Sequence, residues 1–245
     1  MSALETKNSG FFSGRLDRLV NMEGDPNLKE IRKRAFASFS SMPFLDGGEV
    51  RFDGDLREMP VSRFRESFQP YVEGYSPAGK PCGIAPIGDF AGSLDAELMT
   101  PATGFGGYCL AFFEKGMYVE CGSSADKGFI RIDSGPGVSL EPVYIKVPAG
   151  ASSVLFLSLN GDAGSLGLDA IRAEVCEGSA LKLFIHSRGG GARFVDMSAR
   201  LARDSRAEVF VLRQEGGDFV YRSLVAVKEE NARFTENTLA SLKGR

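Results

Sequence analysis

A chain of 245 residues with 43% hydrophobic and 25% charged residues can bury a sizeable core in one or two domains. Its net charge of −3 argues against nucleic acid or an anionic membrane as the main partner. Residues 1–10 are polar, no apolar run is long enough to span a membrane, and the four cysteines form no Cys-x-x-Cys pair. We therefore expect a cytoplasmic protein without a signal peptide or membrane span.

Two helices are predicted near the N-terminus. The first covers Phe11 to Met22, with its apolar residues on one side. The second begins where Asp25 can cap it and Pro26 fits the first helical position, and Pro43 ends it. The basic residues of this second helix are interpreted as a solvated face rather than an anion-binding site: Lys29, Arg32, Lys33 and Arg34.

The middle of the chain is predicted to be a mixture of strands and loops. Tyr108–Phe113 and Met117–Cys121 resemble the two arms of a hairpin whose turn is formed by residues 114–116. This arrangement places Cys109 opposite Cys121, which would permit a cross-strand thiol pair, a disulfide or a shared metal. The alternative is that both cysteines are small buried apolar residues.

Three regions follow from these patterns: a helical region 1–45, a mixed region 46–138 and a repeat region 139–245. Within the mixed region, Val50–Asp53 is a candidate strand. Three glycine-rich stretches lack the sequence context of a phosphate-binding loop and are interpreted as connections between strands: Gly104–Gly107, Gly161–Gly167 and Gly189–Gly191.

The repeat region contains one short phrase four times. Its leading apolar residues are Val147, Val175, Leu201 and Val227, so the spacings are 28, 26 and 26 residues. Apolar residues alternate before and after each phrase, which indicates two half-buried strands joined by a turn. A recurring unit of this kind predicts a parallel β-helix (a β-solenoid) with repeats of about 26 residues, while a sandwich of hairpins remains the structural alternative.

Alternation predicts that Cys176 and His186 point away from the apolar row of the repeats, so both are candidate groove residues. A metal site needs three or four suitable ligands, and no such cluster surrounds either residue in the sequence. A β-helix enzyme acting on carbohydrate is a further hypothesis. It would use acidic residues of the turns, such as Glu177 and Glu229, although the chain has no Trp to stack on a sugar.

The repeats resemble the SufB/SufD family of iron–sulfur cluster assembly proteins. The residues responsible are Ala173–Leu183, Ala199–Val209 and Ser223–Phe234, in which alternating strands flank an E-G-S-A-like turn. Arg34–Phe44 is similar to the helix and proline-containing segment that precede the core in that family.

This resemblance implies a right-handed parallel β-helix, preceded by a small α+β region, in a non-enzymatic scaffold. It also implies an ABC-type ATPase of the SufC type as partner, a SufB/SufD-like chain or a second copy as another, and a transient iron–sulfur cluster as cargo. No functional residue is transferred from the family. Cys109, Cys121, Cys176 and His186 therefore remain only candidates, and a β-solenoid binding module without cluster chemistry is the alternative function.

The last residues contain nothing expected to cap a solenoid, and an uncapped coil presents unpaired backbone groups. We therefore expect the last coil to pair with another chain. The predicted interface residues are Val225, Val227, Phe234 and Leu239.

Overall fold

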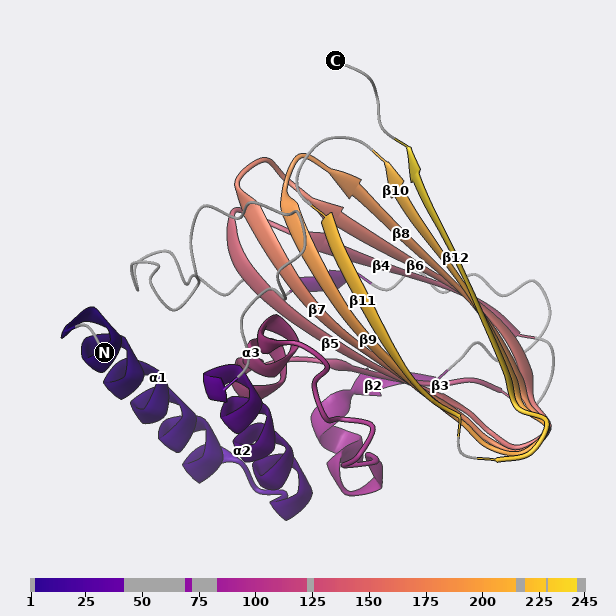
Figure 1. Ribbon diagram of the computed structural model, residues 1–245, viewed down its shortest axis with the longest axis horizontal. Coiled ribbons are helices and arrows are strands. Elements are labelled where there is room, and N and C mark those ends of the chain that lie inside the picture. Colours follow the sequence, from indigo (N-terminus) through magenta and orange to yellow (C-terminus); the bar gives the residue numbers. More distant parts are fainter. Residues whose placement is uncertain are drawn as a thin grey trace.

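The computed structural model describes residues 3–41, 69–71, 83–122, 126–214, 219–227 and 229–241. A layer of helices lies against one face of a β-solenoid, as Figure 1 shows. The helices are α1 (Ala3–Met22), α2 (Pro26–Ser41), α3 (Gly104–Phe112) and the 3-10 helix η2 (Ile87–Ser93). In these ranges no helix is long and apolar enough to cross a membrane. The candidate strand Val50–Asp53 falls outside the described residues.

The described strands form two sheets of six. The first sheet has the order β11-β9-β7-β5-β3-β2 and the second has the order β1-β4-β6-β8-β10-β12. The strands of the first are β2 (Gly83–Pro86), β3 (Met117–Glu120), β5 (Gly137–Val147), β7 (Ser165–Val175), β9 (Ala192–Leu201) and β11 (Phe219–Val227). Those of the second are β1 (Gln69–Tyr71), β4 (Asp126–Ser134), β6 (Ser152–Gly161), β8 (Ala180–Gly189), β10 (Arg206–Gln214) and β12 (Arg233–Ser241).

Consecutive strands of the repeats alternate between the two sheets, and each pairs in parallel with the strand two further along the chain. In the second sheet Ser152 pairs with Ala180, Ala180 with Arg206, and Arg206 with Arg233. The predicted solenoid is therefore confirmed, and the hairpin sandwich is wrong. The parallel pairing begins earlier than residue 139, because β3 already pairs with β5 and β4 with β6.

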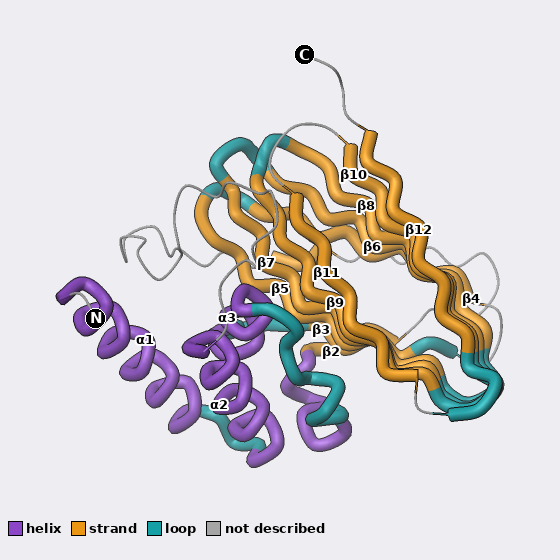
Figure 2. The backbone as a smooth tube through the Cα atoms, viewed as in Figure 1, coloured by secondary structure: helices purple, strands orange, loops and turns teal. Residues whose placement is uncertain are grey.

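The predicted turns stack at one end of the solenoid (Figure 2). Gly150, Gly178, Asp204 and Asn231 have φ values of 70°, 64°, 56° and 59°. This left-handed conformation favours Gly, Asn and Asp, which is why each turn uses one of them. The N–H groups of the first three donate to carbonyls of the next coil, at Glu177, Arg203 and Glu230, with distances of 2.9 to 3.0 Å.

The two N-terminal helices are as predicted, although α1 begins at Ala3 rather than Phe11. Asp25 caps α2 because its Oδ1 accepts from the N–H groups of Asn27 at 2.8 Å and Leu28 at 3.1 Å. The prediction of a solvated basic face fails for Arg32, which is 4% exposed.

The predicted hairpin of Tyr108–Phe113 with Met117–Cys121 is wrong. Residues 104–112 form α3, with Thr103 as N-cap accepting from the N–H of Gly106 at 3.0 Å. Every residue of α3 is buried, so the helix has no polar face and its sequence shows no helical period. The stretch Gly104–Gly107 is likewise the first turn of a helix and not a loop.

Two apolar cores result from this arrangement. One fills the solenoid between the sheets near the stacked turns and includes Val143, Leu183 and Val209. The other lies outside the first sheet, where α1, α2 and α3 cover it, and includes Phe39, Phe112 and Leu168. The first sheet is therefore buried on both faces, whereas the second sheet is covered on its inner face.

Candidate functional site

The structure separates the two cysteines of the predicted hairpin. Cys109 lies in α3 within the core under the helices, and Cys121 follows β3 within the core of the solenoid. Both are buried, as the apolar interpretation expects. Burial raises the pKa of the Cys109 thiol well above its ordinary value, so this residue is an unreactive thiol.

Cys176 and His186, the two candidate groove residues, do not form a shared site. Cys176 lies in the turn that precedes β8, and it is partly exposed. Partial burial, with the negative charge of Glu174, raises its pKa. His186 lies on the outer face of β8, as alternation predicts, with its Nε2 3.1 Å from Oε1 of Gln214. Within the described part of the chain, no three His, Cys, Asp or Glu side chains are grouped so that they could hold a metal ion.

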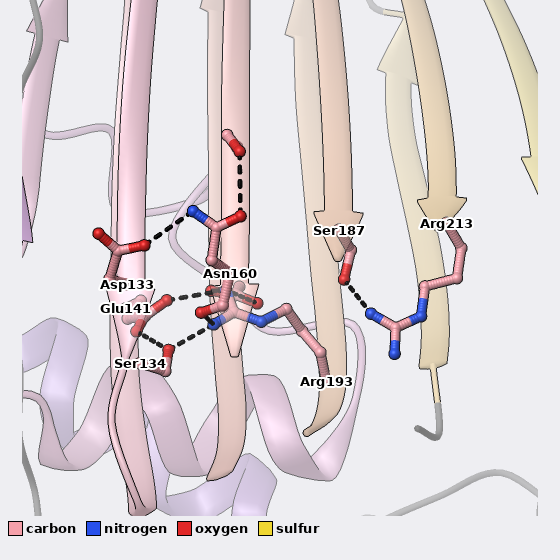
Figure 3. Close-up of polar contacts among 9 residues, drawn as sticks. Asp133, Ser134, Glu141, Asn160, Ser187, Arg193 and Arg213 are labelled. Carbon is pink, nitrogen blue, oxygen red and sulfur yellow. Dashed lines mark hydrogen bonds and ion pairs between the residues drawn. The ribbon is translucent and has the colours of Figure 1, made fainter. Parts of the chain in front are cut away.

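A group of buried charged side chains lies inside the solenoid, at the ends of the strands opposite the stacked turns. Figure 3 shows the contacts of Arg193 with its neighbours. Nη1 of Arg193 donates to Oε2 of Glu141 at 3.0 Å and to Oδ1 of Asp169 at 3.1 Å. Its Nη2 donates to the hydroxyl of Ser134 and to the backbone carbonyl of Asn160. The Ser134 hydroxyl in turn donates to Oε1 of Glu141 at 2.6 Å. We call Glu141, Asp169, Arg193 and Ser134 the interior charge cluster.

Three strands of the first sheet bring the charged residues together, and Ser134 reaches them from the end of β4 in the second sheet. Glu141 of β5 and Asp169 of β7 are partners in the parallel register. Arg193 of β9 pairs with Gly167, one inward position away. A Cβ on Gly167 would lie 2.7 Å from Nε of Arg193, so the glycine leaves room for the guanidinium group.

The sequence contains a signal for this cluster that the repeat analysis missed. In β5, β7 and β9 the apolar positions change phase, from one face of the strand to the other. The earlier apolar residues, such as Leu140 and Leu168, face the helices, while the later ones, such as Val143 and Ile171, face the solenoid interior. By alternation, the inward positions before the change hold Glu141, Asp169 and Arg193.

Burial and the neighbouring charges set the protonation of the cluster. Burial raises the pKa of Asp169 well above its usual range; Arg193 opposes this shift, and the negative charge of Glu141 adds to it. For Glu141, burial would raise the pKa, but Arg193 and hydrogen bonds from Asp169 and Ser134 bring it below the usual value. Glu141 is therefore the anion that balances Arg193, and Asp169 keeps a proton to higher pH than an ordinary Asp.

Polar contacts continue along the solenoid interior beyond this cluster. Nη1 of Arg213 in β10 donates to the hydroxyl of Ser187 in β8 at 2.8 Å. Its Nη2 donates to the backbone carbonyl of Gly189 at 3.1 Å, and Figure 3 shows it beside the interior charge cluster. This end of the solenoid is thus lined by arginines that bind backbone and side-chain oxygens.

A third buried acidic residue, Asp196, joins the helices to the solenoid. Asp196 of β9 accepts from the N–H of Ala102 at 3.0 Å and from the hydroxyl of Thr103 at 2.6 Å, and it pairs with Arg172 at 2.7 Å. Its carboxylate packs so closely on Gly106 that a Cβ there would overlap it. The glycine-rich start of α3 therefore has an anion from this chain at its positive end.

Arg32 has the complementary role at the other end of α3. Its Nη1 donates to the carbonyls of Ala111 at 3.1 Å and Phe113 at 2.8 Å. Its guanidinium lies 4.3 Å from the centre of the Phe113 ring and 3.7 Å from Oε2 of Glu23. The positive charge offsets the negative end of the helix, which explains why this arginine is buried rather than solvated.

The predicted interface residues lie in the last coil of the described chain. Val225 of β11 and Phe234 of β12 are partly buried and pack against the solenoid core. Val227 and Leu239 lie in the same two strands, and their side chains fall outside the described set. Among the described strands, β11 and β12 each lie at one end of their sheet, and β2 and β1 lie at the other ends. Each therefore presents a strand edge without a partner in this part of the chain.

Neither the protein-family models nor the curated proteins give a match to this chain. The function is therefore argued from the residues and their geometry.

Proposed function

We propose that this protein is a scaffold or accessory subunit of iron–sulfur cluster assembly, working with an ABC-type ATPase of the SufC type. The main support is the coil itself: the E-G-S-A-like phrase that resembles the SufB/SufD family occupies the turn that joins β7 of the first sheet to β8 of the second sheet. This position is compatible with the proposal, since the turn requires a residue tolerant of positive φ and the glycine of the phrase, Gly178, has a φ of 64°.

The proposed role is that of a binding surface rather than an enzyme. Its cargo is a transient cluster, and its second partner is a SufB/SufD-like chain or another copy. The described residues do not gather a ligand set for the cluster, so the proposal assigns none. Cys176 is the candidate thiol of first interest, because Cys109 and Cys121 are buried in different cores.

The last coil supports the proposal that the protein pairs with a SufB/SufD-like chain or with another copy of itself. The edges of β11 and β12 offer backbone N–H and C=O groups to an added strand, and Val225 and Phe234 provide partly buried apolar side chains beside them. Light scattering at micromolar concentration should therefore detect a dimer or a complex, and Phe234→Lys should weaken it. A stable monomer that also binds no SufB/SufD-like chain would contradict this part.

Copurification tests the proposal most directly. The tagged protein is isolated from its native cells without oxygen, and its partners are identified. An ABC-type ATPase or a SufB/SufD-like chain is expected. Reconstitution with iron and sulfide is then compared for the wild type and Cys176→Ser, with Cys109→Ser as the matched buried control. Recovery of neither partner, together with no cluster absorbance, would overturn the proposal.

A β-solenoid binding module without cluster chemistry is the second candidate. The outer face of the second sheet favours it, because that face exposes aromatic side chains that the helices do not cover. The two candidates differ in the reconstitution experiment, since the binding module predicts partners but no cluster.

A further inference from the structure

Four phenylalanines form a continuous row on the outer face of the second sheet. Phe129, Phe156, Phe184 and Phe210 occupy the same register position on β4, β6, β8 and β10. The rings of Phe156 and Phe184 stack at 4.6 Å and 8°, and those of Phe184 and Phe210 at 4.7 Å and 11°. We call this row the phenylalanine ladder.

Phe129 and Phe156 of the ladder are exposed to solvent although they are large and apolar, while Phe184 and Phe210 are half-buried. Phe129 is 36% and Phe156 is 41% exposed, while their sequence neighbours Ile130, Leu155 and Leu157 are buried inside the solenoid. Stacking between coils accounts for contact between the rings, worth about 0.5–1.5 kcal/mol per pair. It does not explain why Phe129 and Phe156 remain exposed. An exposed apolar patch rimmed by polar residues is typical of an interaction surface.

Positive charge flanks the ladder. Among the described side chains on this outer face, six are basic: Lys127, Arg131, Lys182, Arg188, Arg206 and Arg233. Two are acidic: Asp133, which pairs with Arg131 at 2.9 Å, and Glu208, which pairs with Lys182 at 3.0 Å. The face therefore has an excess of four positive charges (six minus two) on a chain whose net charge is −3. This positive charge would attract an acidic partner.

The orientation of the rings narrows the choice of ligand. Their faces are occupied by stacking on one another, so it is mainly ring edges that meet the solvent. The edge is the positive part of the aromatic quadrupole, so it favours carboxylates and apolar groups. Sugars and nucleic acid bases bind aromatic side chains through the ring face, which is not available here.

We propose that this face binds an acidic amphipathic helix of a partner protein, laid across the strands along the phenylalanine ladder. Neighbouring strands are about 4.8 Å apart, so the four rungs span about 14 Å, which a helix of about ten residues covers. Apolar side chains at i, i+4 and i+7 contact the rings, and Asp or Glu beside them face Lys127, Lys182 and Arg188. This surface does not depend on cluster chemistry.

Two synthetic helical peptides test the inference on the full chain. They share one apolar seam, and one carries Glu while the other carries Lys at the flanking positions. Fluorescence anisotropy should show binding of the Glu peptide alone, and its affinity should fall as salt is raised. Phe156→Gln and Lys127→Glu should each weaken binding at least about tenfold, a loss of about 1.4 kcal/mol.

Leu224→Gln is the matched control, because Leu224 is an apolar residue 53% exposed on the first sheet. It should leave the affinity unchanged, and thermal melting of each variant checks that the fold is retained. No binding of the Glu peptide, equal binding of the Lys peptide, or an equal loss in Leu224→Gln would overturn the inference. Phe156-dependent binding of phosphatidylserine vesicles or of a single-stranded oligonucleotide, without binding of the Glu peptide, would replace the helix with that ligand.

Discussion

The two ends of the solenoid interior are filled by different kinds of side chain. Near the stacked turns the inward residues are aliphatic, such as Val147, Val175 and Leu201. At the other end they are charged, with Glu141, Asp169 and Arg193 all at most 2% exposed. The apolar residues of these strands there face outward instead, against α2 and α3. The difference shows that one strand can belong to two cores, and that the charged end depends on complete pairing while the aliphatic end depends on packing.

Removing the cation should have the largest effect. Arg193→Met leaves the carboxylate of Glu141 buried without its partner, so the free energy of unfolding should fall by about 3–5 kcal/mol. Chemical denaturation measures the loss. Arg206→Met, an exposed arginine of β10, should change stability by no more than about 0.5 kcal/mol.

A double variant sharpens this result. Arg193→Met combined with Glu141→Gln removes both charges, so it should be less destabilised than the sum of the single variants. Strict additivity of the two losses would show that Glu141 is not the anion that balances Arg193.

Adding one methyl group to the charged end should have the next largest effect. In Gly167→Ala the new Cβ lies 2.7–2.8 Å from the guanidinium atoms of Arg193, so the arginine must move and its bonds to Glu141 and Asp169 weaken. A loss of about 1–3 kcal/mol is expected in denaturant titrations. Gly88→Ala is the control, because a Cβ there meets nothing within 4 Å. Equal stability of both variants would mean that the cluster has spare room.

At the other end, the turns should be more tolerant. Gly178→Ala places a β-carbon at a φ of 64°, which should cost about 1 kcal/mol. Asp204 lies in the equivalent turn at a φ of 56°. Asp204→Gly relieves the strain of that conformation, although it removes the hydrogen bond that Nδ2 of Asn231 donates to Asp204 at 3.0 Å. Thermal melting should rank Gly178→Ala below the wild type and Asp204→Gly close to it. The reverse order would contradict the role given to positive φ.

The smallest effect is expected for Asp169→Asn. Since the pKa of Asp169 is raised, a neutral amide resembles its protonated form, and the change in stability should be below about 1 kcal/mol at any pH below that raised pKa. Glu141→Gln should cost more than Asp169→Asn, because it removes the charge that balances Arg193.

Titration of stability distinguishes the two carboxyl groups. The contribution of Asp169 is complete below the ordinary Asp pKa of about 3.9 and is lost as pH rises through its raised value in the folded protein. The contribution of Glu141, whose pKa is lowered, is lost as pH falls instead. Denaturation midpoints at increasing pH should therefore decline less in Asp169→Asn than in the wild type. An unchanged decline would assign the proton to another group.

Local patterns sufficed for part of the fold. The spacing of Val147, Val175, Leu201 and Val227 predicted the coils, because each coil must place an apolar residue at the same point before its turn. Asp25 and Pro26 predicted the start of α2, since capping acts within one helical turn. The outward position of His186 followed from strand alternation alone.

The failures occurred where one segment is buried by another that lies far away in the sequence. The all-buried sequence of α3 resembled a strand, because Asp196 and Arg32 supply the polar contacts at its ends. The predicted pairing of Cys109 with Cys121 is wrong because it depended on a hairpin in which α3 would have been a strand. The interior charge cluster was missed because its charges are paired only after β5, β7 and β9 are in register.

The sequence by itself determined the repeating coil and the residues tolerant of positive φ in its turns, because both depend on contacts within about two neighbouring strands. Tertiary structure alone decided which face of each strand is core, where the charges of the cluster are balanced, and that Phe129 and Phe156 of the phenylalanine ladder stay exposed. Those properties depend on what packs against a strand from outside, and the helices cover the first sheet but not the second.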